Sequence, residues 1–176
     1  MTGHGPHSDE HSPPDPSTKV VGLQAASLAV CLALVTNASH RSHTESIVCK
    51  NDASNQWSYF QSKRIKHHLL ELGGEVAVMV GAKGEAAAKI TEHYAKDLER
   101  YDKESEAIKR KAEEMEEKST HAEHRAARFD IAEGLIEIGV ILTSLFFLSK
   151  RRLFPVVGFL AGLVGALVGA SAFLLA

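Results

Sequence analysis

The sequence predicts an all-α membrane protein with three transmembrane helices and a long antiparallel coiled-coil hairpin between the first and second of them. Three observations support this fold class. Hydrophobic residues concentrate in three runs, Val20–Val35, Ile131–Leu148 and Leu153–Ala176. Nearly all charged residues lie between the first two runs, from Arg41 to Asp130. That charged stretch also lacks proline, so a helix can run through most of it.

Residues 1–17 are expected to form a disordered tail. They are rich in proline, histidine, serine and aspartate and have too few apolar residues to fold, and they lack the basic start of a signal peptide. The two cysteines of the chain, Cys31 and Cys49, are too few for a disulfide framework. With 20 basic and 22 acidic residues the net charge is -2, which argues against a nucleic acid partner.

The lengths of the apolar runs decide where the membrane helices are placed. A helix needs roughly 17 to 25 residues to cross a hydrocarbon core of about 30 Å. We therefore predict transmembrane helices over 18–37, 131–149 and 153–175. The rest of the chain is too polar to cover these runs as a soluble core, so the expected partner around them is a lipid bilayer.

Residues 38–130 are predicted to form an extramembrane helical hairpin. Neither proline nor glycine occurs in 23–72 or in 85–133, whereas glycines cluster in 73–84, which is the expected tip. A tip near residue 78 pairs positions whose numbers add up to roughly 157 in an antiparallel hairpin. This register places Trp57 near Tyr101 and Phe60 near Leu98.

A seven-residue repeat in the returning arm of the hairpin predicts the coiled coil. Tyr94, Tyr101, Ile108 and Met115 recur at this interval, and the second seam position is occupied mostly by small residues. Small residues at a seam let a partner helix approach closely. The predicted large seam side chains are Trp57, Phe60, Tyr94, Leu98, Tyr101, Ile108 and Met115.

Two stretches carry a resemblance to a known family: "NQWSYFQSKRIKHHLLEL" and "RFDIAEGLIEIGVILTSLFFLSKRRLF", followed by a glycine-rich final run. The chain from Thr18 onward resembles the bacterial membrane proteins grouped as domain of unknown function 4337. The resemblance implies a three-pass protein of the bacterial inner membrane and brings no known activity. The usual family pattern has an amide where Glu137 stands, so it lends Glu137 no role.

The final apolar run contains two ridges of small residues at four-residue spacing. Such ridges let membrane helices pack backbone against backbone. Because packing inside one protomer needs only one ridge, we expect a homo-oligomer or docking on a larger membrane protein complex. The helix-association residues are Gly158, Gly162 and Ala166 on one ridge and Ala161, Gly165 and Gly169 on the other.

Glu133 and Glu137 lie within the second apolar run and share a helix face with Ser144. A charge at the centre of a membrane helix costs about 2.5 to 3.5 kcal/mol, so such residues often line a functional path. A possible ion path would therefore use Glu133, Glu137 and Ser144. The favoured interpretation is that a water-exposed helix enters lipid at this point, because one stripe gives little polar lining.

Ten histidines raise the question of a metal site. His121 and His124 share a helix face, and the antiparallel register brings His40 and His43 to a similar height, so four imidazoles could hold zinc or copper. Ordinary polar surface is the favoured interpretation, and no cofactor is expected. The sequence contains no HExxH, P-loop or GxSxG motif, so we do not expect an enzyme.

The short link with Lys150, Arg151 and Arg152 is predicted to be cytoplasmic by the positive-inside rule, which places the hairpin in the periplasm. The expected function is that of a non-enzymatic, membrane-anchored scaffold or accessory subunit. It would self-associate or dock on a larger membrane complex through the third membrane helix and the coiled coil. The alternative is a small oligomeric ion or proton conducting protein that uses Glu133 and Glu137.

Overall fold

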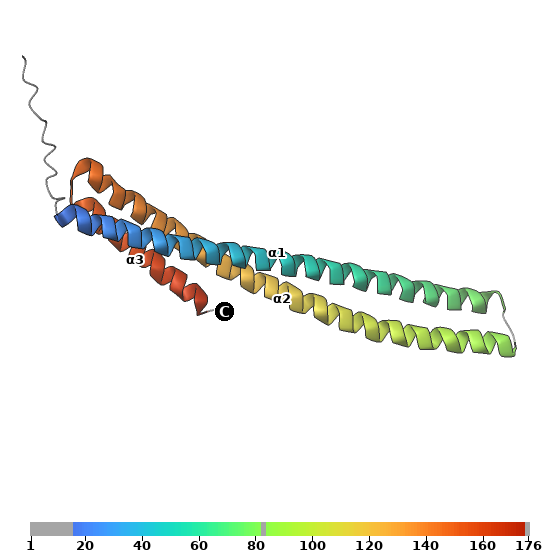
Figure 1. The fold of residues 1–176 in the computed structure, drawn as a ribbon. Helices are drawn as coiled ribbons and strands as arrows, with labels where there is room; N and C mark the ends of the chain where they lie inside the picture. The colour runs from blue at the N-terminus through green and yellow to red at the C-terminus, as the bar shows by residue number, and fades with distance from the viewer. Residues whose placement is uncertain (1–15, 82–83, 175–176) are drawn as a thin grey trace, which may run out of the picture. The chain divides into compact units, whose positions relative to one another are not determined.

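The computed structural model describes residues 16–81 and 84–174, which form three α-helices (Figure 1). Helix α1 spans Pro16–Met79, α2 spans Glu85–Ser149 and α3 spans Leu153–Phe173. No strand occurs within the described residues. The predicted all-α class is therefore confirmed. Residues 1–15 of the predicted tail lie outside the described residues, whereas residues 16 and 17 begin α1 instead of belonging to a tail. The last residue of the predicted third span also lies outside the described residues.

Each of the three helices contains an apolar stretch long enough to cross a membrane. In α1 and α2 this stretch is one end of a helix more than 60 residues long, whereas α3 is apolar throughout its 21 residues. The unbroken length of α1 and α2 follows from the sequence, because no proline interrupts either helix after its first residue. These helices fit a membrane protein by length and composition.

The chain divides into two compact units. Residues up to Ser39 together with those from Ala127 onward form the first, called the apolar unit here, and His40–Ala126 form the second, called the hairpin unit. All of α3 belongs to the apolar unit, while α1 and α2 each contribute to both.

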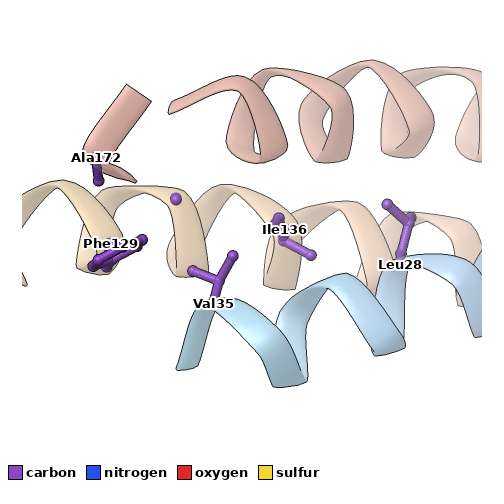
Figure 2. Packing of buried hydrophobic residues seen from close by; sticks show 6 residues of the cluster. Leu28, Val35, Phe129, Ile136 and Ala172 are labelled. Carbon is purple, nitrogen blue, oxygen red and sulfur yellow. The ribbon is translucent and has the colours of Figure 1, made fainter. Parts of the chain in front are cut away.

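The core of the apolar unit is small and draws on all three helices. Figure 2 shows Leu28 and Val35 of α1, Phe129 and Ile136 of α2 and Ala172 of α3 gathered together. Burying these side chains against each other is favourable in proportion to the apolar area they remove from water, and their interdigitation fixes how the helices pack.

The link between α2 and α3 is very short and ends α2 with a left-handed residue. Lys150 has φ 55°, and its amide donates to the Phe146 carbonyl oxygen at 2.8 Å. This geometry satisfies one of the carbonyls left over at the end of a helix. Leu153 then begins α3, and Pro155 lies in its first turn, where a missing amide proton is tolerated.

The turn of the hairpin unit lies later in the chain than predicted, because only the last part of the glycine cluster in 73–84 forms it. Gly81 and Gly84 have φ 74° and 96°, conformations that favour glycine, and they flank the turn between α1 and α2. Gly73 and Gly74 continue α1 instead. A Cβ atom on Gly73 would lie 3.5 Å from the Tyr94 ring, so this ring packs over the glycine and supports the helix there.

The pairing register of the hairpin unit differs from the predicted one. The predicted register would have placed Lys63 opposite Tyr94, but Lys63 pairs with Glu104 and contacts the Tyr101 ring. Trp57 stacks edge to face on Phe60 of its own helix, with ring centroids 5.7 Å apart. The expected pairing of Trp57 with Tyr101 was therefore wrong. The register differs from the predicted one because α1 continues through Gly73 and Gly74, which places the turn later in the chain.

Candidate functional site

A close backbone contact in the apolar unit joins Gly139 of α2 and Gly158 of α3. A Cβ atom on Gly158 would lie 2.6 Å from the Gly139 carbonyl oxygen, and one on Gly139 would lie 2.7 Å from the Gly158 carbonyl oxygen. Real Cβ atoms do not approach so closely. The two backbones can therefore touch only because both residues are glycine, as in small-residue packing of membrane helices.

The glycines of both predicted ridges are buried inside a single chain. A Cβ atom on Gly165 would lie 2.8 Å from the Ala132 carbonyl oxygen, and one on Gly169 would lie 3.3 Å from Val35. A Cβ atom on Gly162 would overlap Leu28 Cδ2, so the Leu28 side chain would have to move to make room. The expectation that one ridge would suffice within the protomer was therefore wrong. Ala161 and Ala166 are half-buried.

A polar link crosses the apolar unit beside these glycines. The Gln24 side-chain amide donates to Thr143 Oγ1 at 3.1 Å and to the Pro155 carbonyl oxygen at 2.7 Å. Thr143 is fully buried. One side chain of α1 thus connects to α2 and α3 at once, and such bonds contribute about 0.6 kcal/mol each between membrane helices.

The acidic residues of the predicted ion path are not brought together on one interior surface. Glu133 is half-buried and accepts a hydrogen bond from Thr36 Oγ1 of α1 at 2.7 Å. Glu137 and Ser144 are exposed, and Ser144 donates to the Ile141 carbonyl oxygen of its own helix. Within the described chain, therefore, Glu133 belongs to a helix contact, and Glu137 faces outward.

The seam of the hairpin unit is built from small side chains. Ser105, Ala112, Ser119 and Ala126 are buried at seven-residue intervals on α2, and small α1 residues face them, among them Ser46. Ser119 Oγ donates to the Ser46 carbonyl oxygen at 3.0 Å. The predicted large seam side chains, Trp57, Phe60, Tyr94, Leu98, Tyr101, Ile108 and Met115, are all half-buried.

Charged side chains border this seam. Lys63 Nζ lies 2.5 Å from Glu104 Oε2, and its side chain is only 14% exposed. The hydrogen bond to Glu104 raises the pKa of Lys63 above its ordinary value, and the same bond lowers the pKa of Glu104. Arg125 similarly joins Ser42 and Glu45 of α1. These pairs connect α1 to α2 at two heights of the hairpin unit.

Ser105 and Ser119 occupy equivalent seam positions but differ in hydrogen bonding, which gives a testable contrast. The buried Ser105 hydroxyl makes no hydrogen bond to any described residue, whereas Ser119 bonds to Ser46. We expect Ser105→Ala to stabilise the hairpin unit by about 0.5 to 1 kcal/mol, because it removes an unsatisfied polar group and favours helix. Ser119→Ala should instead destabilise it by about 1 kcal/mol.

Urea denaturation of the full chain in mild detergent measures this contrast. The chain has one tryptophan, Trp57, and its fluorescence reports on the hairpin unit. A Ser105→Ala variant that unfolds at a lower urea concentration than the parent would contradict the assignment of Ser105 as unsatisfied.

The predicted histidine quartet does not gather into a metal site. His40, His43, His121 and His124 are all exposed. Among the described residues, donor atoms close enough to share one metal ion are found at His67, His68 and Glu71. Their spacing of one and four residues on one helix can be read in the sequence. The predicted metal site used the histidines nearer the membrane spans and not this group.

Among the exposed large apolar side chains of α1 in the hairpin unit, five form one row along the helix. They lie at alternating spacings of four and three residues and are 47 to 75% exposed. We call them the outer stripe: Ile65, Leu69, Leu72, Val76 and Met79. Since His67 and Leu70 of the same turns are half-buried, the outer stripe lies on the side of α1 away from α2. Sequence reasoning missed it, although its seven-residue period is readable.

Comparison with known proteins places the chain in a family. No curated protein and no solved structure matches it. A family model described as domain of unknown function (DUF4337) matches residues 17–175, which include nearly all of the three helices described above. The chain therefore belongs to the DUF4337 family.

Proposed function

We propose that this protein is a non-enzymatic, membrane-anchored scaffold that self-associates through the outer stripe of its helical hairpin. The apolar unit serves as the anchor, with three transmembrane helices, and the hairpin unit is a coiled coil that lies outside the lipid. The single observation that carries the proposal is the outer stripe, an apolar helix face without a covering element among the described residues.

The anchoring role is supported by how little of the apolar sequence is covered. Of the most apolar 18 residues in each helix, 11% are buried in α1, 28% in α2 and 28% in α3. Most of the apolar surface of each stretch therefore remains exposed, which is unusual for a soluble monomer. A bilayer would cover it at no cost in unsatisfied backbone groups, because every spanning segment is helical.

The outer stripe fits a second copy of the same chain. Its spacing is that of the apolar positions in a coiled coil, so two stripes can interlock along their length. Two chains anchored in one membrane would present α1 in parallel, with each apolar residue opposite its own counterpart. Five residues are fewer than the roughly 20 to 30 on each side of a standard interface. We therefore expect two chains to associate weakly when they are dilute and more strongly when both are anchored in one membrane.

In this proposal the third helix completes the anchor. Its four glycines are buried and pack against α1 and α2 of the same chain, so these glycines are already occupied within one protomer. The basic link at Lys150–Arg152 supports a cytoplasmic position for that link in a bacterial inner membrane, with the hairpin in the periplasm.

Crosslinking through single cysteines tests the proposal. In a variant with Cys31 and Cys49 replaced by serine, Leu72→Cys should form a disulfide-linked dimer in native membranes under mild oxidation. The matched control is Ala107→Cys, which is exposed on α2 of the same unit and should remain monomeric. Equal dimer formation at both positions, or none at Leu72, would count against self-association through the outer stripe.

One observation keeps a second candidate function in view. Glu137 is exposed about 18 Å along α2 from Ser149, inside the lipid-facing stretch if the link lies at the membrane surface. In an oligomer such a carboxylate could line an ion path together with Glu133. Proton flux into liposomes that disappears with Glu137→Gln would identify this alternative, whereas the scaffold proposal expects no flux.

A further inference from the structure

Two histidines and a glutamate near the end of α1 bring three donor atoms together. One ring nitrogen of His67, one of His68 and one oxygen of Glu71 all lie within 4.8 Å of one another. His68 Nδ1 lies 2.9 Å from Glu71 Oε2, and His67 Nδ1 lies 3.5 Å from the same oxygen. The two imidazole rings are nearly perpendicular, with centroids 5.7 Å apart. Both rings thus approach one carboxylate oxygen from different directions.

His67 Nδ1 is the part of this group that needs a partner. The atom is buried and makes no hydrogen bond to any described residue, since its approach to Glu71 is too long or too poorly directed to count as one. A buried polar atom without a partner costs free energy, and native structures rarely keep one. An ion placed between the three donors would satisfy it.

The two donor separations that involve Glu71 are close to those expected around a tetrahedral ion. Ligand bonds of about 2.0 to 2.1 Å in a tetrahedral site place neighbouring ligands roughly 3.3 Å apart. The observed separations from Glu71, 2.9 and 3.5 Å, lie on either side of that value. We propose that His67, His68 and Glu71 bind a divalent transition metal ion of the zinc, cobalt and nickel type, with the fourth position left to solvent.

The donor set decides which ions are excluded. Imidazole nitrogens suit zinc, copper, nickel and cobalt, while calcium and magnesium require oxygen ligands. Both imidazoles must be neutral with the remaining proton on Nε2, and Glu71 must be ionised. Metal binding would therefore replace the hydrogen bond between His68 Nδ1 and Glu71 Oε2, because both atoms would become ligands.

This site is distinct from the outer stripe. None of its three donor residues belongs to the stripe, and all three come from one helix of one chain. Metal binding is therefore expected in a single chain and does not depend on self-association. Loss of metal binding and loss of dimer crosslinking are separate results.

Cobalt(II) titration of the full chain in detergent tests the site. His4, His7 and His11 are first replaced by alanine, so that these tail histidines cannot contribute. This parent should bind one cobalt(II) per chain, with the intense visible absorption of a tetrahedral site, and zinc should displace the cobalt. His67→Gln and Glu71→Gln should each weaken binding by at least about tenfold.

Matched variants separate this site from general histidine binding. His121→Gln and His124→Gln remove exposed histidines elsewhere on the hairpin unit and should leave cobalt affinity unchanged. Circular dichroism confirms that each variant remains helical. Unchanged cobalt affinity in folded His67→Gln and Glu71→Gln, or no bound cobalt in the parent, would overturn the assignment.

Discussion

Replacing Gly158 with leucine is expected to separate α2 from α3 and to lower the melting temperature of the apolar unit by roughly 4 to 24 °C. A Cβ atom there would meet backbone and side-chain oxygens at 2.6 Å, those of Gly139 and Thr143. The Gly139 oxygen cannot move without shifting a helix, and the Thr143 backbone nitrogen would lie only 3.0 Å away as well. Overpacking of this kind costs about 1 to 3 kcal/mol, and 1 kcal/mol corresponds to roughly 4 to 8 °C in a unit of this size.

The native Cys31 reports this loss of packing. It is half-buried against the core of the apolar unit, so its reaction with a maleimide in detergent should rise at the temperature where the helices separate. Cys49 is replaced by serine for the experiment. The matched control is Gly134→Leu on α2, because a side chain at Gly134 would meet nothing within 4 Å. Equal melting temperatures for the two variants would contradict the packing described here.

The double substitution Leu69→Glu and Leu72→Glu should abolish self-association while leaving the chain folded. Both leucines are exposed in the single chain, at 62% and 55%, so glutamate there costs little within one hairpin. In the proposed dimer the same positions meet their counterparts, which would place four carboxylates in a desolvated interface. Burying unpaired charge is among the most destabilising changes known for an interface.

Crosslinking at Val76→Cys, in chains without Cys31 and Cys49, measures this effect. We expect the dimer fraction in membranes to fall at least about tenfold with the double glutamate substitution. Ala95→Glu with Ala107→Glu adds the same charge to exposed positions of α2 and should leave the dimer intact. If both double variants reduced crosslinking equally, net charge rather than the outer stripe would explain the result.

The three helices were predictable because length and composition fix them. Apolar runs of sufficient length and the absence of proline from 17–154 specify long helices without reference to any neighbour. The seven-residue repeat of α2 likewise predicted which face carries Ser105, Ala112 and Ser119, and these side chains are buried. Local periodicity was sufficient for each of these features.

The register and the glycine contacts could not be predicted, since they depend on partners far away in the chain. Gly73 and Gly74 have the composition of a turn, but the Tyr94 ring packs over them and the helix continues. The four glycines of α3 form ridges suited equally to another chain or to its own. Only the packing of Leu28, Ala132 and Gly139 shows that the chain itself fills them.

Labelling of two matched cysteines tests most directly whether the apolar unit is embedded in a bilayer with the hairpin unit outside it. Val30 in the apolar unit and Ile47 in the hairpin unit lie on the same helix and are almost equally exposed, at 62% and 60%. In open membrane fragments without Cys31 and Cys49, a charged maleimide should label Ile47→Cys rapidly and Val30→Cys only after detergent is added. Equal labelling of both positions before detergent would contradict the account.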